Sequence, residues 1–188
     1  MMESAIIVSS SEKGTQFFTE MLNAAGIHQI VSLQTAGEVR RHLMEKDYDL
    51  VIINSPLRDE TGESLSQHIA SRDVSQVMLV VNSDLYDAVS AVSEDFGVMT
   101  ISKPVNKAVF WSALKLAGAA QSRLKRAHAE NTMLKKRIED IRVVDRAKCI
   151  LISSMNMSEK EAHRYIEKRA MDMRISRRAV AEEILENV

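Results

Sequence analysis

The side chains with the clearest chemistry are seven cations near the C-terminus: Arg142, Arg146, Lys148, Arg169, Arg174, Arg177 and Arg178. Arginine binds phosphate oxygens through paired hydrogen bonds, and its planar guanidinium also stacks on exposed bases. A group of this kind is typical of an RNA-binding surface. The alternative is that these cations only keep long helices hydrated, and the residue types alone leave that alternative open.

The formal charge is distributed unevenly along the 188 residues, although the total is only −1. Residues 1–114 contain 8 Lys and Arg against 15 Asp and Glu, a net charge of −7, whereas residues 115–188 contain 17 against 11, a net charge of +6. A basic segment attracts nucleic acid by releasing condensed counterions, and an acidic segment is repelled. We therefore expect the C-terminal part, and not the N-terminal part, to meet polyanions.

Strand-like apolar runs alternate with amphipathic helical patterns through the first half of the chain. The expected strands are Ala5–Val8, Gln29–Ser32, Leu50–Ile53, Gln76–Val81 and Met99–Ile101. The expected helices lie near Gly14–Ala25, Ala36–Glu45, Glu63–Ser71, Leu85–Phe96 and Asn106–Leu116. This alternation predicts an α/β fold in which helices cover both faces of a parallel sheet.

Three short motifs accompany these runs. Asp49-Leu-Val-Ile-Ile-Asn-Ser-Pro56 contains the third strand, Asp59-x-x-Gly62 follows it, and Ser102-Lys103-Pro104 closes the fifth. Together with the alternation of strands and helices, these motifs resemble the response-regulator receiver domain over residues 1–117. The resemblance implies a flavodoxin-like fold with a five-stranded parallel sheet.

The phosphorylation site that this resemblance implies has lost its carboxylates. Receivers need an aspartate nucleophile at the end of the third strand and two acidic residues after the first strand to hold Mg²⁺. The matching positions hold Asn54, Ser9 and Ser10, with Asn82 and Lys103 at the remaining ones. An amide is a poor nucleophile, and serine hydroxyls are weak neutral ligands. The sequence therefore predicts a pseudo-receiver without a metal site, in which these polar residues cap strand ends and Lys103 is structural.

A domain without this switch can still serve as a docking surface for a regulatory protein. In receivers the fourth helix, fifth strand and fifth helix commonly form such a surface, which corresponds here to Asp84–Glu94, Met99–Ser102 and Val105–Leu114. Phe110 and Trp111 fall in this region. An aromatic pair at the start of a helix is more often core than interface, so we expect these two rings to pack inside.

A heptad repeat follows without a Pro-rich or Gly-rich linker, and we expect residues 118–141 to form a coiled coil. With Ala117 taken as position a, the candidate dimer contacts at a and d are Leu124, Asn131, Leu134, Ile138 and Ile141. An asparagine at position a favours two parallel strands, because its amide can pair with its symmetry mate. The sequence predicts a parallel homodimer. The alternative is a single amphipathic helix that packs back on its own receiver-like domain.

Residues 142–188 are expected to form a small basic module of three helices. The first ends near Ser153-Ser154, the second follows Ser158 with Glu161 at capping-box spacing, and the third follows Ser176. The residues expected to face inward are Ala162, Tyr165, Ile166, Ala170, Val180, Ala181, Ile184 and Leu185. We also expect Cys149 to be buried and four methionines to fill packing gaps at the two turns, namely Met155, Met157, Met171 and Met173.

Several positions of this module follow one family pattern. They are Arg142, Ala147-Lys148 before an Ile-Leu-Ile run, Ser158-Glu159-x-Glu161-Ala162, Ala170-Met171 and Val180-Ala181. The pattern resembles that of the ANTAR family of RNA-binding transcription antiterminators, although Cys149 stands where the family usually has Gly. The resemblance implies a dimer that binds paired hairpin loops in a leader transcript and prevents an intrinsic terminator from forming. Within the basic group, Arg142 and Lys148 match the pattern, and the other five cations are inferred from charge and position.

Other classes of protein have little support. A single cysteine cannot form an internal disulfide, no secretory leader pattern opens the chain, and the apolar runs are too short for a bilayer, so we expect a cytoplasmic protein without membrane contact. The histidines show no ligand spacing with Cys149, and no Gly-rich phosphate loop occurs. We therefore expect no enzyme, metal or cofactor.

Two further functions remain open at this point. A receiver-derived coiled-coil adaptor could bind an acidic protein through its basic tail. A DNA-binding response regulator is disfavoured, because the C-terminal helices lack a clear Gly-containing helix-turn-helix spacing.

Overall fold

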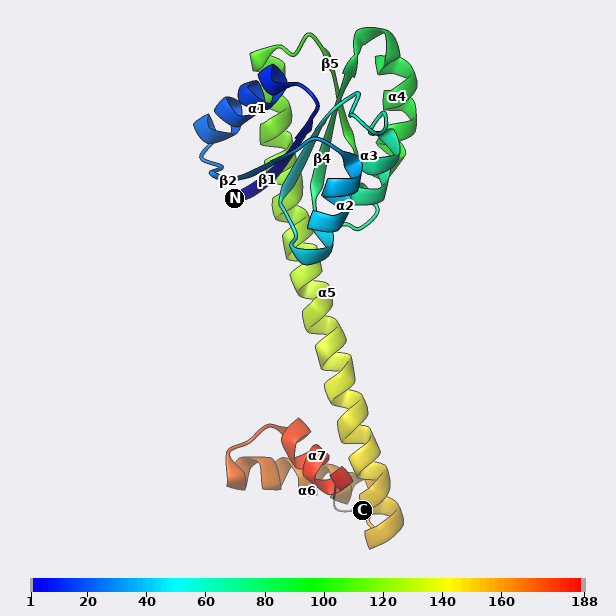
Figure 1. The fold of residues 1–188 in the computed structure, drawn as a ribbon. Helices are drawn as coiled ribbons and strands as arrows, with labels where there is room; N and C mark the ends of the chain where they lie inside the picture. Colours follow the sequence, from blue (N-terminus) through cyan, green and yellow to red (C-terminus); the bar gives the residue numbers. More distant parts are fainter. Residues whose placement is uncertain (1, 187–188) are drawn as a thin grey trace. The chain divides into compact units, whose positions relative to one another are not determined.

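The computed structural model describes residues 2–186 and divides the chain after Ala127 into two compact units. The first unit is built on a parallel sheet whose strands are β1 (Ser4–Ser9), β2 (Gln29–Leu33), β3 (Leu50–Asn54), β4 (Gln76–Asn82) and β5 (Met99–Lys103). Their order is β2-β1-β3-β4-β5, and every neighbouring pair is parallel (Figure 1). The expected five-stranded parallel sheet is confirmed.

Helices cover both faces of this sheet. They are α1 (Glu12–Ala24), α2 (Ala36–Glu45), α3 (Glu63–Ala70), α4 (Tyr86–Ser93) and the start of α5 (Lys107–Met155), with short 3-10 turns η1 (Ser83–Leu85) and η2 (Glu94–Phe96). One core contains buried residues of α2, α3 and α4, and the other contains buried residues of α1 and α5. Phe110 is fully buried in the second core and Trp111 packs against it, as expected for this aromatic pair.

Strand register brings the polar residues that end the strands to one edge of the sheet. Ser9 lies beside Asn54, and Asn82 lies beside Lys103. The carboxyl ends of parallel strands always share an edge, and ligand sites of this fold class occur where the strand order reverses, here between β1 and β3. Because the sheet aligns these residues, their chemistry can be judged as one site.

Different sides of helix α5 are buried in different parts of its length. Phe110, Leu114 and Ala117 are buried in the first unit, so the expected first heptad position at Ala117 is wrong. At that point α5 still serves as the fifth helix of the sheet domain. Further along, Leu134 and Ile138 are each 52% exposed and Ile141 is 53% exposed. The apolar side chains at the heptad positions are therefore exposed only in the part of α5 that follows the residues packed on the sheet.

A buried carboxylate fixes α5 to the amino end of β3. Asp49 lies immediately before β3, and its side chain accepts hydrogen bonds from the Glu3 backbone N–H at 2.7 Å and the Ser4 N–H at 3.4 Å. The Lys125 ammonium on α5 lies 2.6 Å from the same carboxylate. Burial pushes the pKa of Asp49 upward, but the hydrogen bonds and the Lys125 charge outweigh burial, and the pKa lies below its ordinary value.

The second unit is a three-helix module formed by the C-terminal part of α5, α6 (Glu159–Met173) and α7 (Arg177–Glu186). Its core contains Val143, Ala147, Leu151, Ala162, Ile166, Ala170, Val180 and Ala181, with Tyr165, Ile184 and Leu185 partly buried against it. Ser158 and Glu161 form the expected capping box, and the Ser176 hydroxyl accepts from the Ala179 N–H at 3.1 Å. The predicted three helices are confirmed, and α5 ends at Met155.

Two packing expectations in this module are wrong. Cys149 is exposed, because Ala147 and Leu151 on either side of it face inward, and two residues turn a helix through about 200°. Met155, Met171 and Met173 are exposed, and of the four methionines only Met157 packs against the core. The core of the module is instead formed by other side chains of the three helices, among them Leu151, Ile166 and Val180.

Within residues 2–186, no helix combines the length and the apolar character that a membrane span requires.

We predict that Asp49→Asn lowers the free energy of unfolding of the first unit by about 2 kcal/mol, since a buried, charge-assisted set of hydrogen bonds loses its anion. The folded-state pKa of Asp49 lies below its unfolded value, so the carboxylate contributes fully above about pH 4 and less as the pH falls through the folded-state pKa. Denaturant unfolding of both proteins at neutral and acidic pH measures this difference, which should shrink in acid. Asp47→Asn is the matched control, because Asp47 is exposed and, among residues 2–186, its one ion pair is with exposed Arg72 at 3.3 Å. An equal effect of both substitutions would contradict the assignment.

Candidate nucleic-acid interface

At the carboxyl edge of the sheet, two of the residues that the sequence analysis assigned to the receiver site, Asn54 and Ser9, bond to each other. Asn54 Nδ2 donates to Ser9 Oγ at 2.9 Å, and the Ser9 hydroxyl donates to the Ser11 carbonyl at 3.0 Å. Gly14 of α1 packs directly on this pair, since a Cβ at that position would lie 2.5 Å from Asn54 Nδ2. The amide and the hydroxyl are thus tied into a closed arrangement of neutral groups.

The remaining groups at this edge also bond within the domain. Lys103 donates to the Ser55 carbonyl, and burial lowers the pKa of its ammonium. The Ser10 hydroxyl donates to the Pro56 carbonyl at 3.0 Å, while Asn82 is exposed. The carboxylate of Asp59 is bonded to the first N–H groups of α2, at Ala36 and Gly37. Among the described residues, no cluster of three His, Cys, Asp or Glu side chains is placed to hold a metal ion.

The basic group near the C-terminus separates into two classes in the second unit. Arg146 and Arg174 are exposed, and within residues 2–186 neither forms an ion pair; Arg142 is 73% exposed at its side chain and only approaches Glu139, at 3.9 Å. Arg174 ends α6 in a left-handed conformation with φ of 55°. These three arginines are the cations of the group whose guanidinium groups can contact a ligand without first breaking a close ion pair.

The other four cations bridge helices of the module. They are Lys148, Arg169, Arg177 and Arg178. Lys148 on α5 lies 2.8 Å from Asp145 and 3.1 Å from Glu159 of α6, and its hydrogen bonds to these two carboxylates raise the pKa of its ammonium. Arg178 on α7 lies 2.7 Å from both Asp140 of α5 and Glu182, and these contacts raise its pKa. We expect these four side chains to hold the helices together before any ligand arrives.

A cleft of about 690 Å³ brings part of the basic group together between α5, α6 and α7. It is lined by Lys136, Arg137, Asp140, Ile141, Val144, Asp145, Lys148, His163, Ser176, Arg177 and Arg178. The sequence analysis missed Lys136, Arg137 and His163. A signal was present, because Arg137, Ile141 and Lys148 recur at helical spacing on one side of α5. Arg142, Arg146, Arg169 and Arg174 do not line this cleft.

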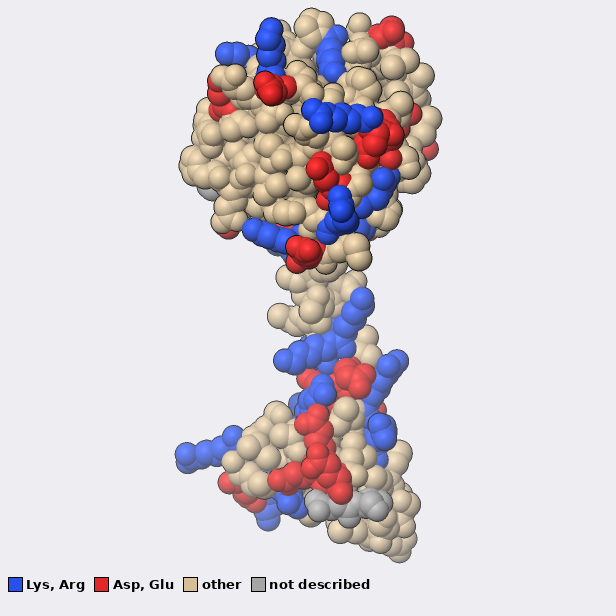
Figure 2. All heavy atoms as spheres, in the orientation of Figure 1, with Lys and Arg blue, Asp and Glu red and all other residues tan. Residues whose placement is uncertain are grey.

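Cations and acids alternate on the surface of the module. On the face shown in Figure 2, Lys and Arg side chains gather along the second unit with Asp and Glu between them. A mixed surface of this kind gives weak long-range attraction, because neighbouring opposite charges cancel beyond a Debye length of about 8–10 Å. Binding must then depend on the particular cations that remain unpaired.

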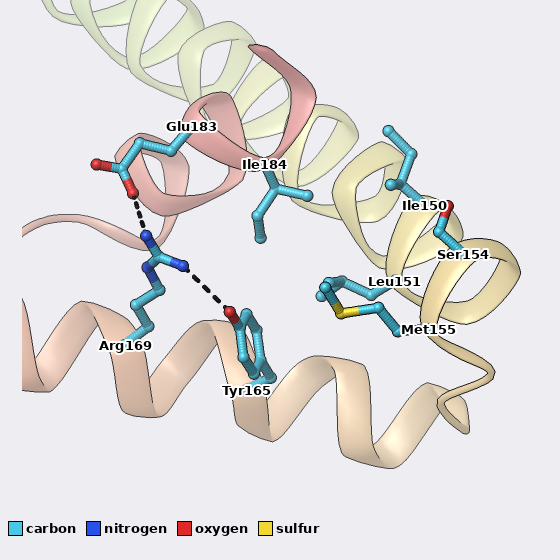
Figure 3. Close-up of a pocket in the computed structure, with 8 residues that line it drawn as sticks. All are labelled: Ile150, Leu151, Ser154, Met155, Tyr165, Arg169, Glu183 and Ile184. Carbon is cyan, nitrogen blue, oxygen red and sulfur yellow. Dashed lines mark hydrogen bonds and ion pairs between the residues drawn. The ribbon is translucent and has the colours of Figure 1, made fainter. Parts of the chain in front are cut away.

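A smaller hollow lies at the far end of α5, where Tyr165 joins an ion pair between α6 and α7. Arg169 donates to the Tyr165 oxygen at 3.1 Å and to Glu183 at 3.0 Å (Figure 3). Tyr165 is partly buried against the core, so its expected inward placement holds for the ring, while the hydroxyl takes part in a polar network. This network could not be inferred from spacing, because Glu183 comes from a different helix.

The second unit matches a known domain family. Residues 132–185 match the model of the ANTAR domain, which confirms the resemblance seen in the sequence. The match begins ten residues before Arg142, within the part of α5 that carries the exposed heptad side. It includes the whole of α6 and most of α7.

The chain as a whole is similar to the transcriptional regulatory protein PdtaR of Mycobacterium tuberculosis, found in strains H37Rv and CDC 1551. Each is 27% identical over 170 residues, which cover 90% of this chain and 82% of the relative. The similarity therefore extends over both units and the helix α5 that they share.

Solved structures match the first unit. A CheY-like receiver domain from Methanospirillum hungatei aligns with a TM-score of 0.58 at 20% identity, covering 65% of this chain and 98% of that one. The receiver domain of an HD-domain protein from Pseudomonas fluorescens aligns with a TM-score of 0.56 at 21% identity, covering 70% and 93%. These likenesses establish the receiver fold and, at such identities, the fold alone.

Proposed function

We propose that this chain, which carries an ANTAR domain behind a domain of receiver fold, is an RNA-binding regulator of transcription antitermination. Its ligand is a pair of hairpin loops in a leader transcript, and holding the loops prevents a terminator stem from forming. The protein acts by binding and catalyses no reaction. The ANTAR match over residues 132–185 supports the RNA ligand, and the similarity to a transcriptional regulatory protein supports the regulatory role.

The observation that carries the RNA proposal is the division of the basic group into paired and unpaired cations. Lys148 and Arg178 already have carboxylate partners at 2.7 to 3.1 Å. Arg142, Arg146 and Arg174 are exposed and lack close carboxylate partners among the described residues. Phosphate contacts by unpaired cations release counterions and give most of the affinity for nucleic acid. The unpaired arginines are therefore the proposed phosphate contacts, and the paired cations shape the surface.

We predict that Arg142→Gln combined with Arg146→Gln weakens binding to a leader hairpin and lowers the slope of log affinity against log salt by about 2, roughly one for each phosphate contact. Fluorescence anisotropy with labelled RNA over a salt series measures both quantities. Circular dichroism should be unchanged, since neither side chain bridges two helices. Lys13→Gln with Arg58→Gln, two exposed cations of the first unit, is the control and should leave affinity unaltered.

Competition by duplex DNA of equal length tests the DNA-binding alternative. Unchanged affinity and slope in the Arg142 and Arg146 variant would overturn the assignment.

The domain of receiver fold acts, in this proposal, without aspartyl phosphorylation. Asn54 and Ser9 occupy the positions of nucleophile and metal ligand and are bonded to each other at 2.9 Å. The domain can still dock a regulatory protein, because the face of α4, β5 and α5 exposes large apolar side chains, among them Val92 (55%) and Val109 (54%). Partner binding or dimer formation would then control activity.

Treatment with a small phosphodonor and Mg²⁺ should add no phosphoryl group to the first unit, because the site offers neither a carboxylate nucleophile nor an acidic metal ligand. Intact-mass spectrometry measures the adduct, with a phosphorylatable receiver domain treated in parallel as a positive control. A stoichiometric adduct that is labile to base, within residues 1–117, would contradict the pseudo-receiver assignment.

We further propose that residues 118–141 pair with a second copy as a parallel coiled coil. The proposed seam contains Leu124, Asn131, Leu134, Ile138 and Ile141. Leu134, Ile138 and Ile141 are about half exposed, although they are large and apolar. The module core uses another side of α5, since Val143 follows Leu134 by nine residues, about two and a half turns. Two modules on one coil make the second loop contact intramolecular, which raises its effective concentration.

The wild-type protein should sediment as a dimer at micromolar concentration without a phosphodonor. Leu134→Lys with Ile138→Lys should shift it to monomer, because like charges would replace the apolar seam. Asn131→Leu should stabilise the oligomer but relax its register or strand number, since the buried amide is the element that specifies two strands. Analytical ultracentrifugation measures all three proteins. A wild type that stays monomeric even with RNA present would refute both the coiled coil and the two-loop mechanism.

A further inference from the structure

The hollow at the end of α5 has a volume of about 280 Å³ and is built by all three helices of the module. It is lined by Ile150, Leu151, Ser154, Met155, Tyr165, Arg169, Glu183 and Ile184. In Figure 3, Tyr165 and Arg169 rise from α6, Ile184 reaches in from α7, and Leu151 and Met155 close the side formed by α5. Its size is just below the range of pockets for drug-sized ligands, which suits a single small ring system.

The lining has an apolar part and a polar part. Leu151 is almost fully buried and Ile184 is partly buried, so together with Met155 they offer an apolar wall. Tyr165, Arg169 and Glu183 form a connected polar edge, with donor distances of 3.1 and 3.0 Å. A ligand that fits both parts has flat apolar faces and hydrogen-bonding groups around its rim. Nucleobases have this combination of properties.

Tyr165 and Arg169 retain hydrogen-bond donors that the network within the polar edge does not use. The Tyr165 oxygen accepts from Arg169, and within residues 2–186 its hydroxyl donates no hydrogen bond, so its proton can be donated to a ligand. Arg169 uses two nitrogens for Tyr165 and Glu183, and a guanidinium carries five N–H groups in all. The phenol and the guanidinium can therefore donate to ring nitrogens or carbonyl oxygens of a base.

Unpaired cations lie next to the hollow along α5. Arg146 precedes Ile150 by four residues, and Arg142 precedes Arg146 by the same spacing, so successive turns place them along one side of the helix. Both are exposed. RNA loops present unstacked bases beside their phosphates, and proteins read such bases by stacking and by hydrogen bonds to their edges. A phosphate on Arg146 would leave an adjacent base within reach of the hollow.

We propose that this hollow binds one unstacked base of the RNA loop, between the apolar wall from α5 and α7 and the polar edge of Tyr165 and Arg169. The inference rests on the proposed RNA-binding function and adds the position at which the loop is read. Phosphates contribute affinity without sequence information, whereas this hollow contributes dependence on the identity of one base.

Two neighbouring serines provide a matched test in the full-length protein. Ser154 is exposed and lines the hollow, so Ser154→Phe fills it without removing a hydrogen bond formed by the wild-type side chain within the described residues. Ser153 is also exposed but does not line the hollow, and Ser153→Phe, which removes the bond from the Ser153 hydroxyl to the Ile150 carbonyl at 3.1 Å, is the control for added bulk on α5. The ligands are a leader hairpin with its loop and the same stem as a blunt duplex without a loop.

Ser154→Phe should weaken hairpin binding by about tenfold or more, the size expected for loss of one stacked base, and should leave duplex binding unchanged. Ser153→Phe should bind both RNAs as the wild type does. Tyr165→Phe keeps the ring and removes the donor, so it should reduce discrimination among loops that differ at one base. Thermal unfolding of each variant verifies that the module remains folded.

The outcomes separate this inference from the function on which it rests. If the wild type binds the hairpin and Ser154→Phe binds it equally well, the hollow is not a base site and the antitermination proposal stands. If Ser154→Phe weakens duplex and hairpin equally, the effect is not on a loop base and the inference is overturned. If the wild type binds neither RNA, both proposals fail.

Discussion

Both units depend on α5, because this one helix contributes apolar side chains to both cores. Any one side of the helix can be buried against only one set of neighbouring residues. Phe110, Leu114 and Ala117 complete the core against the sheet, and Val143, Ala147 and Leu151 complete the core of the module. Because a helix advances by 100° per residue, these two sets fall on different sides from Leu134 and Ile138. The helix therefore has no single apolar stripe along its length. Instead, each part of the helix is amphipathic, with its apolar side facing the core that this part helps to form.

The polar groups at the two ends of β3 are stabilised in different ways. At the carboxyl end, the Asn54 amide donates to the Ser9 hydroxyl beneath Gly14, so two neutral side chains pair there. At the amino end, Asp49 remains a buried carboxylate, because backbone N–H groups and Lys125 stabilise its charge. A buried carboxylate is stable at the amino end because hydrogen-bond donors and a cation surround it, whereas the bonded pair at the carboxyl end is neutral.

The sheet and the module could be predicted because their signals are local. Runs of Val and Ile define the strands, and a serine followed three residues later by glutamate defines the start of α6, as the capping box shows. Ala117 and Cys149 were misplaced, because spacing along one helix does not say which neighbour covers which side. The partners of Lys148 and Arg178 were equally out of reach, since Glu159 and Asp140 come from other helices. Candidate cations could thus be identified from sequence, but their division into bridging and unpaired residues needed three dimensions.

That division has a consequence for which surface positions of the module can vary. Positions 142 and 146 hold exposed side chains that bridge no helices among the described residues, so they can vary with little effect on folding. Positions 148 and 178 hold cations whose loss would strand carboxylates on neighbouring helices. A library randomised at the first set and constant at the second would sample many strengths of phosphate binding on one scaffold. Selection could in this way alter affinity in small steps, while the arrangement of the three helices is inherited unchanged.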